Sequence, residues 1–168
     1  KKNVQYINDI YFDSSNTKII IQGQIDSDDN LRFENIENDN DLFTDFNRYD
    51  ENLLNGCINF IKVQFEGGFI SSKDMKCEDS INIVNSQGKI DKIKIENSYH
   101  DGLDIDISDL EIQDIDISNS KNDCLDLSFG NYQFNYIKLE NCSDKAISVG
   151  EKSILNAKNI LANDSNYG

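Results

Sequence analysis

The sequence predicts an all-β fold, a right-handed parallel β-helix (a solenoid) with coils of about 22 residues. Three observations predict it. Apolar residues alternate with polar ones in short runs, as in strands with one buried face. These runs recur at a constant spacing of 22 residues over the second half of the chain. An asparagine recurs at one point of each repeat, just after the last apolar run.

The repeat is clearest from residue 79 onward. Segments that begin at Asp79, Asp101, Asp123 and Lys145 align without a gap. Within each coil the apolar positions are spaced by two, whereas a helical solenoid needs spacings of three and four. The apolar columns are Ile81, Leu103, Leu125 and Ile147; Ile83, Ile105, Leu127 and Val149; Ile93, Ile115 and Ile137; Ile95, Ile117, Leu139 and Leu161; and a weaker column of Ile90, Ile112 and Phe134.

The recurring asparagines are Asn97, Asn119, Asn141 and Asn163. Stacked Asn side chains can hydrogen-bond along a solenoid axis, and Asn tolerates the left-handed backbone of a tight turn. We therefore expect a structural asparagine ladder at this turn.

The two parts of the chain differ in regularity. Residues 57–168 are predicted to form regular coils, which we expect to continue beyond the chain end. Residues 1–56 fit the repeat poorly and are predicted to form an irregular N-terminal cap or the first strands of the solenoid. Strands are expected at 19–25 and 58–65. The Asp- and Asn-rich stretch between them, residues 26–55, is expected to be a cap or long loop over one end of the stack.

The four cysteines are even in number and show no CxxC spacing, which disfavours zinc. Cys57 and Cys77 are expected to form a disulfide across an irregular stretch, which would indicate an oxidising compartment. Cys124 and Cys142 are interpreted as small buried residues, because they align with Gly102, Ala146, Ser98 and Ser120.

The formal net charge of −15 disfavours nucleic acid and anionic lipid as partners. No apolar run reaches the roughly 20 residues that a spanning helix needs, so membrane insertion is not expected. Together with the expected disulfide, the charge suggests an extracytoplasmic location: extracellular, at the cell surface or periplasmic.

The first strand of each coil is predicted to carry the chemistry. Asp79, Asp101 and Asp123 form one column, which Lys145 follows. Carboxylates stacked about 5 Å apart must be neutralised by protonation, by a cation such as Lys145, or by a metal ion. Oxygen ligands at this density suit Ca²⁺ as a cofactor. The predicted metal ligands are Asp79, Asp101, Asp104, Asp123 and Asp126. A simpler alternative is that these aspartates bond the local backbone or are solvated.

Part of this region resembles a known family. The motifs Asp101-Gly102, Asn122-Asp123-Cys124 and the SDKAISVG that follows are similar to the NTDG, DDC and GHG…SIG motifs of polygalacturonase-type β-helix glycosidases, in the pectin-lyase-like superfamily. The resemblance implies that Asp101 and Asp123 match two of the three active-site aspartates. The third falls on Asn122, and the histidine of the family falls on Asp144. CEDSINI, NDCLDLS and NCSDKAISVGEKS also resemble β-helix segments of large uncharacterised bacterial proteins.

Two functions are compatible with these features. The first is an extracytoplasmic module that binds or acts on polysaccharide through its acidic first-strand face, as a hydrolase, lyase or epimerase if it is an enzyme. Its catalytic candidates are Asp101, Asp123, His100, Asp144 and Lys145. Its substrate-binding candidates are Asp104, Asp126, Tyr99 and Tyr132. The alternative is a non-catalytic structural or adhesive solenoid, stabilised by Ca²⁺, within a larger surface protein.

Overall fold

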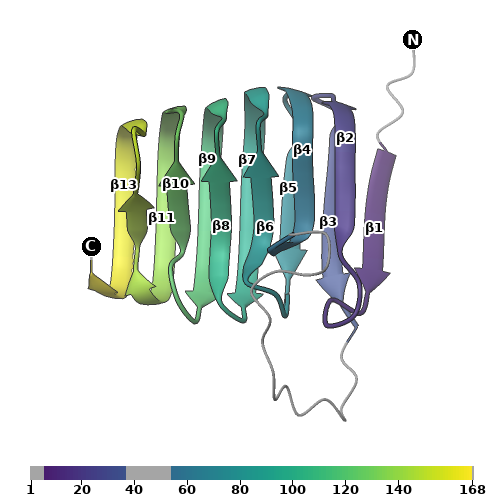
Figure 1. Cartoon of the computed structure of the whole chain (residues 1–168), viewed down its shortest axis with the longest axis horizontal. Helices are drawn as coiled ribbons and strands as arrows, with labels where there is room; N and C mark the ends of the chain where they lie inside the picture. The colour runs from purple at the N-terminus through teal and green to yellow at the C-terminus, as the bar shows by residue number, and fades with distance from the viewer. Residues whose placement is uncertain (1–5, 37–53, 168) are drawn as a thin grey trace.

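The computed structural model describes residues 6–36 and 54–167. These residues form a parallel β-solenoid of about six turns and contain no helix. The coils stack side by side, with β1 and β13 at opposite ends of the stack (Figure 1). The predicted all-β solenoid is confirmed.

Strands account for most of the described chain, and all of their pairings are parallel. In chain order they are β1 (Tyr6–Phe12), β2 (Ile19–Ile25), β3 (Asp29–Asn35), β4 (Gly56–Glu66), β5 (Phe69–Lys73), β6 (Asp79–Val84), β7 (Gln87–Ser98), β8 (Asp101–Asp106), β9 (Asp109–Ser120), β10 (Leu125–Ser128), β11 (Asn131–Lys145), β12 (Ile147–Val149) and β13 (Ile154–Tyr167).

Two series of strands line the solenoid. The short first strands β6, β8, β10 and β12 pair in sequence, and β4 precedes them. The long strands β7, β9, β11 and β13 form the second series. The start of β7 pairs with the end of β4, whereas its later part pairs with β5. A single long strand therefore forms part of two sides of a coil.

The N-terminal strands belong to the same stack: β1 pairs with β3, β3 with β5, and β2 with β4. The strands expected at 19–25 and 58–65 are β2 and part of β4. The expectation of a loop throughout 26–55 is wrong for β3, where Leu31, Phe33 and Asn35 alternate inward. Residues 37–53 of that stretch lie outside the described residues.

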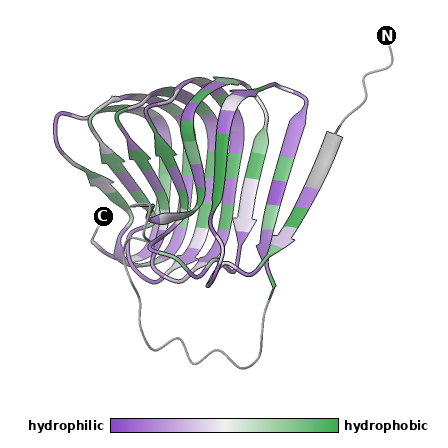
Figure 2. Cartoon of the chain, turned by 45° about the vertical axis from the view of Figure 1, so that its right-hand side comes forward, coloured by the Kyte–Doolittle hydropathy of each residue, from purple (hydrophilic) through white to green (hydrophobic). Residues whose placement is uncertain are grey.

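The predicted register holds through the middle coils. Leu103 pairs with Leu125, and Leu125 with Ile147, each 22 residues later. The stacked apolar columns are fully buried in these coils, and Figure 2 shows them as hydrophobic bands that continue from strand to strand. Burial of this repeating face is the main source of stability.

The gap-free alignment fails in the last coil. Leu139 pairs with Ala162, and Leu161 pairs with Lys138, because one extra residue enters before β13. A shift of one residue turns a side chain to the opposite face of a strand, so Leu161 pairs with Lys138 on the outer face and Ile160 takes the core position opposite Ile137. Both side chains are exposed, because among the described residues β13 pairs with β11 alone.

The asparagine ladder forms with one change of membership. The Nδ2 atom of Asn119 donates to Oδ1 of Asn97 at 2.9 Å, and Nδ2 of Asn141 donates to Oδ1 of Asn119 at 2.8 Å. All three residues have a positive φ near 60°. The same extra residue places Asp164, with φ 54°, at the position expected for Asn163. At the other end, Asn97 donates to Asp74 at 2.7 Å.

Two disulfides each link the start of a coil to its own closing turn. The predicted Cys57–Cys77 bond is present. Cys124 and Cys142 are small buried residues, as predicted, but they also form a second disulfide that the sequence did not predict. The residues with which they align, such as Ala146, Ser98 and Ser120, are buried as well.

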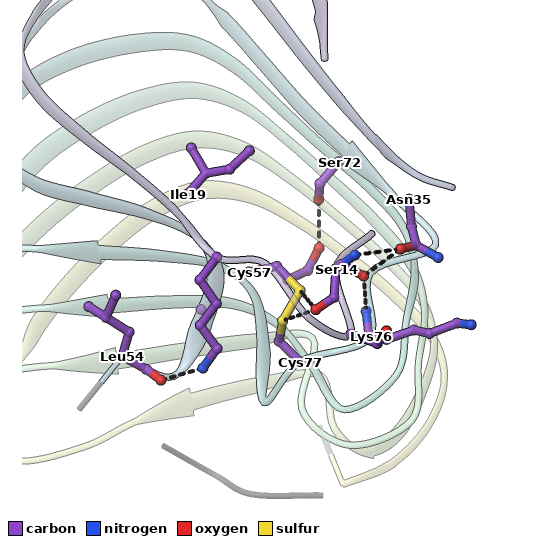
Figure 3. The surroundings of a disulfide bond; sticks show 12 residues. Ser14, Ile19, Asn35, Leu54, Cys57, Ser72, Lys76 and Cys77 are labelled. Carbon is purple, nitrogen blue, oxygen red and sulfur yellow. Dashed lines mark hydrogen bonds between the residues drawn. A yellow bond between two sulfur atoms is a disulfide. The ribbon is translucent and has the colours of Figure 1, made fainter. Parts of the chain in front are cut away.

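The first disulfide is tied to the N-terminal coil through Ser14 (Figure 3). The Ser14 carbonyl oxygen lies 3.3 Å from Sγ of Cys77 and 3.9 Å from Sγ of Cys57. Because disulfide sulfurs carry no hydrogen, these are packing contacts. The Ser14 hydroxyl accepts the N–H of Lys76 at 3.0 Å and donates to Asn35 at 2.7 Å. Residues far apart in sequence thus converge at this bond.

Candidate functional site

The predicted acidic columns exist, and they line the first-strand side of the solenoid. Asp79 pairs with Asp101 across β6 and β8. The pairing also aligns an outer row of polar side chains, namely Asn59, Asn82, Asp104, Asp126 and Ser148. The parallel sheet therefore brings together carboxyl groups 22 residues apart.

The inner row, Asp79, Asp101 and Asp123, is buried and bonds from coil to coil. Oδ1 of Asp101 accepts the backbone N–H of Asp123 at 2.8 Å. Oδ1 of Asp123 accepts the N–H of Lys145 at 2.9 Å. Asp101 and Asp123 are only 8% and 5% exposed. Their bonds to the backbone favour a role in joining coils, which is the simpler alternative raised from the sequence.

Lys145 neutralises the C-terminal end of this row. Its Nζ atom lies 2.8 Å from Oδ2 of Asp144 and 3.1 Å from Oδ2 of Asp123. These hydrogen bonds to Asp144 and Asp123 raise the pKa of the Lys145 ammonium. The structure thus brings together three of the predicted catalytic residues as a compact ion-pair network.

The outer row carries the most unusual ionisation. Burial, reinforced by the charges of Asp106, Asp126 and Asp101, raises the pKa of Asp104 to about 8. Nδ2 of Asn82 donates to Oδ2 of Asp104 at 3.0 Å and opposes this effect only in part. Asp104 is therefore largely protonated at neutral pH and able to donate a hydrogen bond.

Neighbouring carboxyl groups are affected in the same direction. Burial is the main cause that raises the pKa of Asp79, Asp106 and Asp126, and nearby carboxylates add to it. Asp106 is not among the site residues predicted from the sequence. Its alternation with Asp104 in the run Asp104-Ile105-Asp106 could have indicated that both point outward from the same strand.

His100 lies between two carboxylates at the entrance to β8. Its Nδ1 atom is 3.4 Å from Oε2 of Glu78 and 3.6 Å from Oδ1 of Asp101. Glu78 is buried, with a side chain only 7% exposed. The sequence placed Glu78 one coil before His100, but only the structure shows how close the two side chains are.

The predicted tyrosines do not join this site. Tyr132 is fully buried, and its hydroxyl, which has one hydrogen to donate, lies 2.8 Å from the carbonyl oxygen of Ser128 and 3.0 Å from that of Ile105. The expectation that Tyr132 contacts a polysaccharide is therefore wrong. Tyr132 pairs with the buried Leu110 of the preceding coil, and this inward-facing position accounts for its burial.

Tyr99 borders a different feature, an open groove of about 480 Å³ beside the asparagine ladder. The Nζ atom of Lys121 lies 4.7 Å from the centre of the Tyr99 ring, within reach of a cation–π contact. None of the predicted carboxylates lines this groove.

The fold and the acidic rows define the class of protein as a disulfide-linked parallel β-solenoid. Comparison of the chain with protein-family models, curated proteins and solved structures gives no significant match. Among the described residues, no helix is long and apolar enough to cross a membrane.

Proposed function

We propose that the chain is an extracytoplasmic solenoid module that binds or acts on polysaccharide through its acidic first-strand face. The observation that carries the proposal is the pair Asp104 and Asp126. They occupy aligned positions on adjacent coils, and the pKa of Asp104 is raised to about 8. Strongly perturbed carboxyl groups on an accessible surface are candidates for function.

The chemistry of this pair suits sugars. A protonated Asp104 donates a hydrogen bond to a sugar oxygen, which an ionised carboxylate cannot do. Adjacent strands are about 4.8 Å apart, close to the carboxyl separation of about 5–5.5 Å in retaining glycosidases. In this arrangement Asp104 is the proton donor and Asp126 the nucleophile or electrostatic partner.

Asp101 and Asp123 have a different role in this proposal. Their carboxylates already accept backbone N–H groups of the next coil, and Asn122 also donates to Asp101 at 2.6 Å. The resemblance to polygalacturonase-type enzymes implied catalysis by these two aspartates. We infer instead that they position the first strands that display Asp104 and Asp126.

The location and the partner follow from general properties. Two disulfides support an oxidising compartment, and the net charge of −15 disfavours nucleic acid. A solenoid offers equivalent positions at a constant spacing, which suits a repeating polymer. A neutral polysaccharide fits the acidic face better than a uronate polymer, unless Ca²⁺ bridges the charges.

The alternative function is a structural or adhesive solenoid within a larger surface protein, stabilised by Ca²⁺. The observation that favours it is the inner row, in which buried carboxylates serve backbone hydrogen bonds between coils. In that case the acidic face stabilises the solenoid by binding cations and catalyses no reaction.

A glycan-binding array and a depolymerisation screen, each with and without Ca²⁺, distinguish the two functions. The decisive variant is Asp104→Asn/Asp126→Asn, with the exposed Glu111→Gln as the matched control. We expect wild type and control to bind or cleave at least one polysaccharide, and the double variant to lose this at least tenfold while remaining folded. A folded wild type that neither binds nor cleaves any polysaccharide would favour the structural solenoid.

A further inference from the structure

Three potential metal ligands of two chemical kinds converge next to the acidic face. They are Glu78, directly before β6, His100, directly before β8 one coil later, and Asp101, the first residue of β8. One ligand atom from each residue lies within 4.8 Å of the other two. Parallel stacking produces this contact, because backbone hydrogen bonding places Asp101 beside Glu78: the N–H of Asp101 donates to the Glu78 carbonyl at 2.7 Å.

The spacing of these atoms matches a tetrahedral metal site. Zinc binds His nitrogen and carboxylate oxygen at about 2.0–2.2 Å, so neighbouring ligand atoms of a tetrahedron are about 3.4 Å apart. The observed separations from Nδ1 of His100 are 3.4 Å to Glu78 and 3.6 Å to Asp101. The third separation, between the Glu78 and Asp101 oxygens, is within 4.8 Å, so small side-chain rotations bring all three ligands to metal-binding distance.

The chemistry of the three ligands selects the class of metal. Imidazole with carboxylates is typical of zinc and related transition metals, whereas Ca²⁺ prefers six to eight oxygen ligands. Glu78 is buried, and a buried carboxylate needs a compensating positive charge. A divalent ion supplies more charge to this acidic surrounding than a protonated His100 alone.

Neighbouring groups hold the ligands in place. The N–H of Asp123 at 2.8 Å and the amide of Asn122 at 2.6 Å both donate to the Asp101 carboxylate. Such outer hydrogen bonds commonly orient metal ligands. The His100 side chain is 35% exposed, whereas its Nδ1 atom is buried and faces the two carboxyl groups.

We propose that Glu78, His100 and Asp101 form a binding site for a divalent transition metal ion of the zinc class. The site is separate from the Asp104–Asp126 pair, so it does not depend on the proposed action on polysaccharide. Water or a donor group from a bound molecule completes the coordination.

Calorimetric titration of the tag-free chain with ZnCl₂ at neutral pH tests the site. We expect one zinc ion per chain, with affinity reduced at least tenfold in both His100→Gln and Glu78→Gln. The control Glu111→Gln should bind like wild type, and circular dichroism checks that each variant is folded. No saturable zinc binding, or equal affinity in wild type and folded His100→Gln, would overturn the proposal.

A second measurement uses the fact that His100 is the only histidine in the chain. In ¹⁵N-labelled protein, one equivalent of zinc should shift the single imidazole Nδ1 resonance, and ¹¹³Cd²⁺ should show coupling to that nitrogen. Metal binding that leaves the imidazole resonances unchanged would place the ion elsewhere on the acidic face and overturn the assignment. This result requires no mutation and so does not depend on the folding of a variant.

Discussion

The Nδ2 atom of Asn82 lies 3.0 Å from Oδ2 of Asp104, its pairing partner on the next coil. The same amide nitrogen lies 3.4 Å from Oδ2 of Asp79. One neutral side chain therefore separates two carboxyl groups whose pKa values are raised by burial. The protonation of this cluster is linked to the stability of the stacked first strands.

Stability is expected to fall as the pH rises. The folded-state pKa of Asp104, about 8, lies above the value of about 3.9 for an unfolded aspartate. The folded state therefore binds more protons between these values. The contribution of the Asp104 proton to stability is complete below about pH 4 and is lost as the pH rises through about 8. We expect Tm to fall by at least about 4 °C between pH 5 and pH 8, measured by circular dichroism.

The variant Asp104→Asn isolates this effect, because it keeps the shape of the side chain without a titrating group. Its Tm should fall less steeply than that of wild type over the same pH range, with the remaining slope due to Asp79, Asp106 and Asp126. An equally steep decline in the variant would assign the pH dependence to other carboxyl groups, such as Asp79.

Calcium should counteract the loss of stability at high pH. At pH 8 more of the acidic cluster is ionised, and a bound cation offsets the repulsion between its carboxylates. We expect millimolar CaCl₂ to raise Tm by several degrees at pH 8 and by clearly less at pH 5. An equal effect of NaCl at matched ionic strength would indicate general screening instead of a Ca²⁺ site.

Sequence reasoning predicted the solenoid well, because each core column repeats an apolar residue at a fixed spacing. It failed where one residue enters the repeat: Leu161 was assigned to the core and lies outward beside Lys138. The apolar character of β13 gave no warning, since Ile160 and Leu161 are adjacent and either could point inward. Only the pairing with β11 determines the register.

For the site, the sequence identified the columns but not the environment of each carboxyl group. Asp101 and Asp104 belong to one short strand, yet the first bonds backbone of the next coil and the second faces other carboxyl groups. Burial and pKa depend on neighbours from adjacent coils. The disulfide between Cys124 and Cys142 was missed for a related reason. The two cysteines are 18 residues apart and belong to different columns, and the sequence does not show that these columns lie side by side.

The asparagine ladder should contribute through both its hydrogen bonds and its backbone conformation. Asn119→Ala removes two hydrogen bonds of the ladder and places alanine at φ 61°. Together these changes should lower the free energy of unfolding by roughly 2–3 kcal/mol. Asn119→Gly removes the same bonds but tolerates the positive φ, so its cost should be about 1 kcal/mol lower. Urea unfolding at fixed pH measures both values. Equal losses would show that backbone strain is unimportant here.

Ile107 offers a stabilising substitution. This β-branched residue has φ 50° and a 59% exposed side chain, whereas Asn85 occupies the same turn one coil earlier with φ 50°. Isoleucine is strained in this conformation and gains little from burial. We expect Ile107→Asn to increase the free energy of unfolding by about 1 kcal/mol. Ile107→Val keeps the branch and should give no gain. A destabilised Ile107→Asn would mean that the exposed isoleucine makes a stabilising contact.

The second disulfide should account for a large part of the stability of its coil. Its cysteines are 18 residues apart, and closing a loop of this length is worth about 3 kcal/mol. The double variant Cys124→Ser/Cys142→Ser should therefore lower Tm by roughly 6–12 °C. Wild type in a reducing agent loses both disulfides, so its Tm should fall at least as far. An unchanged Tm in the double variant would show that packing alone closes the coil.

The register also predicts where a further disulfide can form. Ser80 and Ser98 occupy the positions of Cys124 and Cys142 two coils earlier, and both are buried. The variant Ser80→Cys/Ser98→Cys should oxidise to a protein without free thiols. The double variant should gain less than about 3 kcal/mol in its free energy of unfolding, because the 2.7 Å hydrogen bond between Ser72 and Ser80 is lost. Ser80→Cys alone provides the control for that loss. Two free thiols in the oxidised double variant would mean that residues 80 and 98 are not as close together as Cys124 and Cys142. The two columns would then be separated by different distances in different coils.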